Sequence, residues 1–218
     1  DLSQRATLTG LSYFAVVTSS GEVRLTSMGG VQYPSQWEWL RDVAASAESS
    51  GGVMIIPQTE LEAVGLARRL TMPVKETAQG TIVPGEEDGA LAIVSTAPFH
   101  DGVLVAVRLL KIRFDLVDSV VAKVGGTSTL FQGGVRVATT VRDAEGDRAV
   151  GTVVSDAVRA QTLERGEPFR GEAFVVTQQF LTAYEPLRDP TGATIGMLYV
   201  GIEKAPYAAA TRTFALTF

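Results

Sequence analysis

The chain contains no cysteine in its 218 residues. Disulfides, thiolate catalysis, cysteine-ligated zinc and covalently attached c-type haem are therefore excluded. A reducing cytosol and a periplasm in which the protein carries no disulfide are both compatible with this absence. Cysteine usage thus limits the chemistry but leaves the compartment open.

Histidine is nearly as scarce, because His100 is the only one. It lies in a predicted turn over residues 99–102 (FHDG), where a solvated loop residue is a better interpretation than a general base. A Ser-His-Asp arrangement would need this side chain, and no G-x-S-x-G, Walker-type or dinucleotide-binding glycine motif is present. The acidic residues 86–88 lack the spacing of a calcium loop. We therefore expect no enzymatic activity, no cofactor and no metal site.

Basic runs and long apolar runs are also missing. The 19 Lys and Arg are outnumbered by 24 Asp and Glu, which gives a net charge of −5, so nucleic acid is not an expected partner. No window of about 18 uncharged apolar residues occurs, so no segment is expected to span a bilayer. The sequence starts without Met or a signal-peptide pattern, and apolar residues accumulate over residues 205–218. We expect a piece of a longer protein, cut close to a membrane entry.

What is present is enough apolar sequence, 45% of the residues, for one large domain or two small ones. Hairpin and helical patterns in the first half predict strands over 12–18, 22–26, 53–56, 90–98 and 103–110, and helices over 35–47 and 60–70. Residues 75–89 have loop composition and no periodicity. The first half therefore predicts an α+β unit.

The second half repeats this plan after a connecting helix over residues 115–124, which Gly125 is expected to end. Its patterns predict strands over 127–131, 135–141, 169–178, 181–187 and 193–202, and a helix over 156–165 with Ser155 as N-cap. Two similar α+β units in tandem, residues 1–113 and 114–218, explain the sequence better than a single domain.

One stretch of the second half combines aromatic and polar side chains. A strand over residues 174–184 would present one face made of Phe174, Val176, Gln178, Phe180, Thr182 and Tyr184. Such a face can line a small pocket. It is equally typical of an ordinary β core whose Gln and Thr lie at a ragged edge.

Cationic side chains lie near this stretch. In the strand over residues 135–141, valines alternate with Arg136 and Thr140, so one face is expected to be core and the other polar. Arg148 precedes Gly151-Thr152, and its guanidinium can form paired hydrogen bonds with a carboxylate ligand. A surface salt bridge from Arg148 to an acidic residue among positions 143–147 is the competing interpretation.

The order of these motifs resembles a known family. RVATT, RAVGT, TAYEPL and G-x-x-IGMLYVG follow one another over residues 123–204, which resemble the fused double-Cache type (a Cache 3/Cache 2 fusion). Domains of that type lie outside the membrane in bacterial methyl-accepting chemotaxis proteins and sensor kinases. Residues 11–110 resemble its membrane-distal unit in outline.

The resemblance implies two tandem PAS-like units, each an antiparallel sheet flanked by helices, in the periplasmic or extracellular part of a membrane-tethered receptor. It implies a small organic acid ligand, such as acetate, propionate or pyruvate, held between sheet and loops. The match to RAVGT implies Arg148 and Thr152 as ligand-site residues, and the match to TAYEPL implies Tyr184 and Thr182. Strand alternation adds Thr140 and Gln178 to the predicted site, and Phe180 supplies an apolar wall. A signal would leave through residues 199–204.

The chain departs from the family pattern at its start. Members usually begin with a long helix that contributes to a dimer contact, whereas about ten residues precede the first predicted strand here. A homodimer is therefore possible but not predicted by the sequence. A ligand-free dimerisation or spacer module of a sensor kinase is the alternative function.

Overall fold

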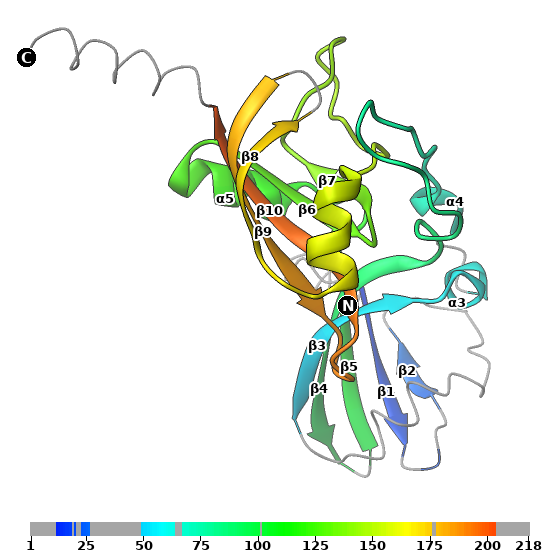
Figure 1. Ribbon diagram of the computed structural model, residues 1–218. Coiled ribbons are helices and arrows are strands. Elements are labelled where there is room, and N and C mark those ends of the chain that lie inside the picture. The colour runs from blue at the N-terminus through cyan, green and yellow to red at the C-terminus, as the bar shows by residue number, and fades with distance from the viewer. Residues whose placement is uncertain are drawn as a thin grey trace, which may run out of the picture. The chain divides into compact units, whose positions relative to one another are not determined.

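The computed structural model describes residues 12–18, 20, 23–26, 49–63, 67–100, 102–175 and 178–203 (Figure 1). The predicted helix over residues 35–47 and the segment from Ala205 onward lie outside the described residues. The chain divides into two compact units. The first comprises Asp1–Thr71, Asp88–Lys111 and Arg188–Ala193, and the second comprises Met72–Glu87, Ile112–Leu187 and Thr194–Phe218.

The first unit contains a five-stranded sheet with strand order β2-β1-β5-β4-β3 and antiparallel pairing. Its elements are β1 (Tyr13–Thr18), β2 (Val23–Thr26), β3 (Ser50–Ile56), α3 (Gln58–Ala63), α4 (Ala67–Leu70), β4 (Ala90–Phe99) and β5 (Gly102–Leu109). The helix predicted over 60–70 is therefore described as two short helices. The predicted hairpin around residues 99–102 is confirmed, with Phe99 paired to Gly102 and His100 in the left-handed region at φ 54°.

Aliphatic side chains fill the core of the first unit. Strand β5 buries every second residue, namely Val103, Val105, Val107 and Leu109. This period of two matches the alternation that the sequence predicts for a strand with one covered face. Burial of such side chains, at roughly 1.5–3 kcal/mol each, is the main stabilising contribution available to this unit.

The second unit contains a sheet with strand order β7-β6-β10-β9-β8. Its elements are α5 (Asp115–Val124), β6 (Thr127–Gln132), β7 (Val135–Thr139), α6 (Asp156–Val158), the π-helix η1 (Arg159–Glu164), β8 (Phe169–Val175), β9 (Gln178–Arg188) and β10 (Thr194–Glu203). When the strands of each unit are numbered in chain order, beginning with β1 in the first unit and β6 in the second, the two sheets have the same strand order. The predicted α+β class with antiparallel sheets is confirmed.

Two helix ends of the second unit follow the sequence signals. Gly125 has φ 74° after α5, and its N–H donates to the carbonyl of Val121 at 2.8 Å. Ser155 has the extended backbone of an N-cap before α6, but its side chain makes no capping hydrogen bond. The N–H of Asp156 instead donates to the carbonyl of Gln79 at 2.8 Å. The start of this helix is thus tied to the segment Met72–Glu87.

The strand predicted over residues 174–184 is two strands in the structure. Strand β8 ends at Val175 and β9 begins at Gln178, and these two residues are paired. The sequence pattern of apolar and amide residues continues from β8 into β9, so the pattern does not indicate the boundary between the two strands. Within β9 the predicted face is correct, because Phe180, Thr182 and Tyr184 are all buried.

Candidate functional site

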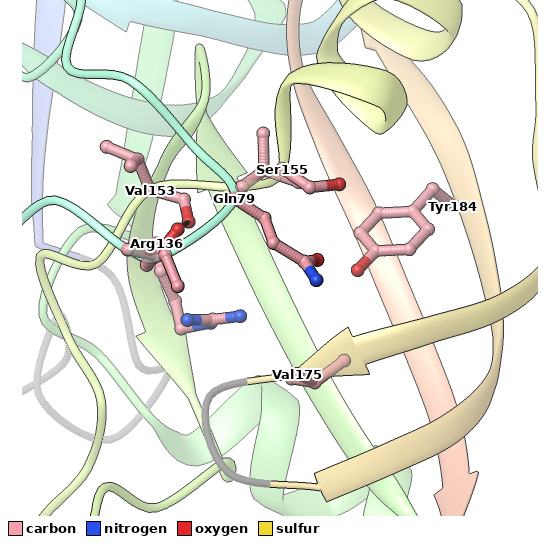
Figure 2. Close-up of a pocket in the computed structure, with 9 residues that line it drawn as sticks. Gln79, Arg136, Val153, Ser155, Val175 and Tyr184 are labelled. Atoms are coloured by element: carbon pink, nitrogen blue, oxygen red, sulfur yellow. Dashed lines mark hydrogen bonds between the residues drawn. The ribbon is translucent and has the colours of Figure 1, made fainter.

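A cavity of about 50 Å³ lies within the second unit (Figure 2). Three strands and two connecting segments supply its lining: Arg136 from β7, Val175 from β8, Tyr184 from β9, residues 77–79, and residues 153–155. All of these residues belong to the second unit. Segments far apart in the sequence therefore meet around one small space.

Arg136 is the charged group of this cavity and is only 4% exposed. It donates a hydrogen bond from Nη1 to Thr152 Oγ1, and its guanidinium carbon lies 5.1 Å from the centre of the Phe131 ring. Its Nε is buried without a hydrogen-bond partner. No described acidic side chain forms an ion pair with it, and burial lowers the pKa of Arg136 from its ordinary value. A buried cation left in this condition is costly to the fold.

Two buried tyrosines stand near this cation. The rings of Tyr184 and Tyr199 are 4.9 Å apart, and the Tyr199 hydroxyl is hydrogen-bonded to Thr127 Oγ1 at 3.0 Å. Burial raises the pKa of both phenols, and the Arg136 charge acts in the opposite direction. In Figure 2 the Tyr184 hydroxyl is directed toward the Gln79 carboxamide. Both tyrosines therefore remain neutral at neutral pH and can donate hydrogen bonds.

The segment Met72–Glu87, here called the strap, supplies one wall of the cavity. Backbone hydrogen bonds attach Lys75 to Gly151 at 2.9 Å and to Val153 at 3.2 Å. At its far end, Glu86 pairs with Arg159 of the π-helix and accepts a bond from the Gly134 N–H at 2.9 Å. Several hydrogen bonds and one ion pair thus hold the strap to the second unit along its length.

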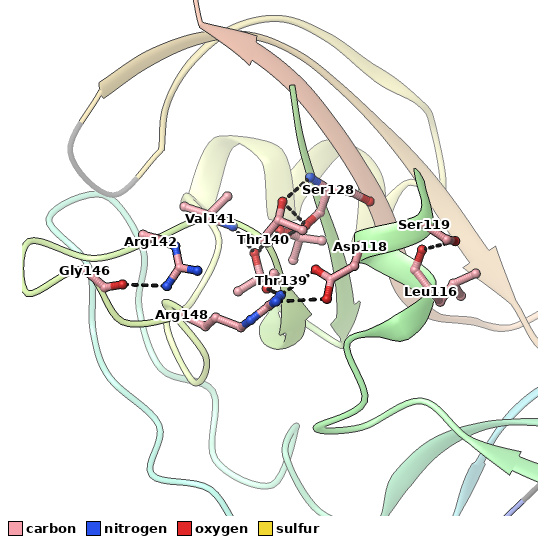
Figure 3. A network of polar contacts seen from close by, with 11 residues as sticks. Leu116, Asp118, Ser119, Ser128, Thr139, Thr140, Val141, Arg142, Gly146 and Arg148 are labelled. Atoms are coloured by element: carbon pink, nitrogen blue, oxygen red, sulfur yellow. Dashed lines mark hydrogen bonds and ion pairs between the residues drawn. The ribbon is translucent and has the colours of Figure 1, made fainter. Parts of the chain in front are cut away.

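Arg148 lies elsewhere, in the polar network of Figure 3. Its guanidinium binds both carboxylate oxygens of Asp118 at 2.8 and 2.9 Å and donates to the Thr139 carbonyl at 2.7 Å. The same group lies 4.4 Å from the ring centre of Phe114. A salt bridge was one interpretation of the sequence, but the partner is on α5, 30 residues away, and is none of the acidic residues expected. Arg148 does not line the cavity of Arg136.

The other predicted site residues are divided among several places. Tyr184 lines the cavity, and Thr152 contacts Arg136 while donating to the Ala149 carbonyl at 2.8 Å. Thr182 donates to the Gly171 carbonyl at 3.0 Å. Thr140 and Phe180 line a separate cavity of about 240 Å³. Gln178 begins β9, and its side chain lies outside the described part of the structure.

Sequence reasoning did not select Arg136, Gln79 or Ser155 as site residues. The available signal for Arg136 was a single cation inside the apolar strand VRVAT. All five residues of β7 are buried, so its polar face is covered rather than solvated. Gln79 lies in a segment with loop composition, where no local pattern indicated a site.

The cavity has binding groups but no described catalytic set. A guanidinium, a phenol and a carboxamide face it together with three valines, which is the usual mixture of a few polar groups and apolar walls in small-molecule sites. Among the described residues, no group of three or more His, Asp or Glu is arranged to hold a metal ion. Within the same residues, no helix has the length and hydrophobicity needed to cross a membrane. The arrangement can bind a small anion.

Comparison with known proteins finds a family similar to the second half of the chain. Residues 108–214 match the family described as Single cache domain 3, about half of the chain. No curated protein matches the chain. The E. coli DcuS sensor domain is 14% identical over 44% of this chain and 70% of that chain, with a TM-score of 0.35.

Two further solved structures cover most of the chain. The ligand-binding domain of the Pseudomonas fluorescens chemoreceptor CtaA, solved with L-serine, is 12% identical over 94% of this chain and 78% of that chain, with a TM-score of 0.42. The sensor domain of the V. cholerae histidine kinase DctB is 11% identical over 93% and 76%, with a TM-score of 0.39. The family match covers the connecting helix α5, the second sheet and the lining of the Arg136 cavity except for residues 77–79. Over residues 108–214 the chain is therefore similar to Single cache domain 3, and no catalytic family is matched.

Proposed function

We propose that the second unit senses a small organic anion of the acetate, propionate or pyruvate class, whose carboxylate binds the Arg136 guanidinium. One observation carries this proposal. A cation that is 4% exposed and has an unpartnered Nε faces a cavity without a described carboxylate. An anionic ligand would supply both the missing charge and the missing acceptor.

The size of the cavity supports a ligand of a few heavy atoms. A water needs roughly 10–15 Å³ of such volume, so about 50 Å³ accommodates about four water-sized groups. Acetate has four heavy atoms. Its carboxylate would face Arg136 and the Tyr184 hydroxyl, and its methyl group would face Val153 and Val175.

The residue roles in this proposal differ from those that the sequence favoured. Arg136 replaces Arg148 as the cation that binds the ligand, because Arg148 is already bonded to Asp118. Thr152 orients the guanidinium through their hydrogen bond, and Tyr184 donates from its phenol. Thr182, Thr140 and Phe180 do not line the cavity of Arg136 and are given no ligand contact in this proposal.

The wider context is part of the same proposal. The chain would be the periplasmic or extracellular portion of a membrane-tethered receptor, with two tandem PAS-like units in the double-Cache plan. The equal strand orders of the two sheets support the tandem plan. Ligand binding would favour one of two conformations and so change the position of residues 199–204, which span the end of β10 at Glu203 and lead into the segment beyond it.

Isothermal titration calorimetry with sodium acetate, propionate and pyruvate tests the proposal in wild-type protein and in Arg136→Met. Arg148→Met is the matched control, since it removes a guanidinium that does not line the cavity. We expect at least one acid to bind, a loss of about 100-fold in affinity in Arg136→Met, and wild-type affinity in Arg148→Met. The unliganded stability of Arg136→Met should equal or exceed that of wild type, because methionine has no buried charge.

Two results would contradict the proposal. Equal affinity in wild type and Arg136→Met would place the ligand elsewhere. Absence of binding for every acid would favour the alternative, a ligand-free spacer or dimerisation module. In that case none of the acids would raise the stability of the folded protein either, because only a ligand that binds the folded state stabilises it.

A further inference from the structure

A larger groove lies next to the cavity of Arg136. Its volume is about 450 Å³, and helix α6 and strands β8 and β9 supply most of its lining, including Ala157, Phe169, Glu172 and Gln179. Two residues, Gln79 and Ser155, line both this groove and the inner cavity. The two spaces are therefore neighbours that share a wall.

Gln79 is the long side chain in that wall. It is an exposed residue of the strap, yet its carboxamide is directed inward, toward the Tyr184 hydroxyl (Figure 2). Figure 2 draws no hydrogen bond from this carboxamide to another residue of the lining. The side chain therefore lies where groove and cavity adjoin, and no drawn hydrogen bond joins its carboxamide to the lining.

The backbone around Gln79 is fixed, in contrast to its side chain. The Gln79 carbonyl accepts the Asp156 N–H at 2.8 Å, and the Thr81 N–H donates to the Asp156 carboxylate at 3.0 Å. Between them, a Cβ on Gly80 would lie only 2.1 Å from the carbonyl oxygen of Val154, so the strap passes too close to permit a side chain there. The size of the opening therefore depends on the residue at position 79 rather than on movement of the strap.

We infer that Gln79 determines the length of the ligand. With the carboxamide in place, the space beside Arg136 ends after about four heavy atoms. Without it, the alkyl chain of a longer carboxylate can extend from the Arg136 site into the groove, where Phe169, Val158 and Ala173 offer apolar contact. This inference rests on the proposed function and adds to it a residue that selects among unbranched carboxylates.

Calorimetric titration with the sodium salts of the unbranched C2 to C6 acids tests the inference in wild type, Gln79→Ala and Gln179→Ala. Gln179→Ala is the matched control, because it makes the same substitution in the groove at a residue that does not line the cavity. Wild type and Gln179→Ala should bind acetate and propionate best, with hexanoate at least about tenfold weaker. In Gln79→Ala, hexanoate should bind at least about tenfold more tightly than in wild type. Gln79→Ser should give the same profile and is available if the alanine variant does not fold.

The outcomes separate the inference from the proposed function. If wild type binds acetate in an Arg136-dependent manner but Gln79→Ala keeps the wild-type chain-length profile, the inference is wrong and the proposed function stands. The inference is equally wrong if wild type already binds hexanoate as well as acetate. If wild type and both variants at position 79 bind no carboxylate, the proposed function fails and the inference fails with it.

Discussion

The two units of this chain share a backbone plan and differ in what they bury. In chain order, the first strand of each sheet has six residues, β1 in the first unit and β6 in the second. The pairing of β1 with β2, and of β6 with β7, shifts register between the fourth and fifth residues of the first strand. Just past this bulge, Val17 pairs with Val23 in the first unit, whereas Phe131 pairs with Arg136 in the second. The same register position therefore holds an aliphatic residue in one sheet and the buried cation in the other.

The cores differ in the same direction. The described core of the first unit consists of Ala, Val, Ile and Leu with a neighbouring Met, whereas that of the second contains the rings of Phe131, Phe180, Tyr184 and Tyr199. Most of the described buried polar residues also belong to the second unit, including Arg136 and Arg159. An identical strand order thus supports a packed aliphatic core in one case and a charged cavity in the other, because the site depends on side chains rather than on topology.

The largest stability effect should come from the partly buried ion pair that fastens the strap in the second unit. Arg159→Met leaves the Glu86 carboxylate with only a backbone N–H partner, so we expect the free energy of unfolding to fall by about 3 kcal/mol in urea denaturation. The matched control is Arg165→Met, which breaks a pair that is more than half exposed and should cost less than about 0.5 kcal/mol. Equal losses in the two variants would show that the strap is not held by this pair.

Alkaline pH should affect the second unit next, through its buried phenols. Burial raises the pKa of Tyr184, so the unfolded chain loses this proton first, near pH 10. Stability from this group is complete below about pH 10 and declines above it by about 1.4 kcal/mol per pH unit, until the folded pKa is reached. Urea unfolding at pH 8, 10 and 11 should show a smaller decline in Tyr184→Phe than in wild type. Parallel pH profiles would mean that the phenol is accessible to water.

A smaller effect is expected at the second guanidinium of this unit. Arg148→Met removes a paired hydrogen bond to Asp118 that is partly exposed, so we expect the unfolding free energy to fall by about 1 kcal/mol. The measurement is again urea denaturation, now at neutral pH. A rise in stability, or any loss of carboxylate affinity, would contradict the purely structural role given to Arg148.

Local sequence patterns predicted much of the second unit. The alternation along β9 correctly placed Phe180, Thr182 and Tyr184 on its buried face, because a strand alternates its side chains whatever surrounds it. The glycine after α5 was likewise identified, since a left-handed residue at that point favours glycine. Both features depend only on residues close together in the chain.

The site itself could not be predicted in this way, because its parts come together only in the folded unit. Strand β7 carries Arg136 on what local alternation marks as a polar face, and that face is buried in the fold. The Arg148 guanidinium meets a carboxylate 30 residues away, and Gln79 reaches the cavity from a segment without periodicity. These contacts depend on tertiary packing, which no local pattern contains.

A crystal structure of the protein saturated with acetate tests the central claim most directly. The account predicts density for one acetate in the cavity, with an oxygen within about 3.0 Å of Arg136 Nε and the methyl group against the valines. A cavity that contains only water under saturating acetate, or one in which Arg136 has turned away from a bound acetate, would contradict it.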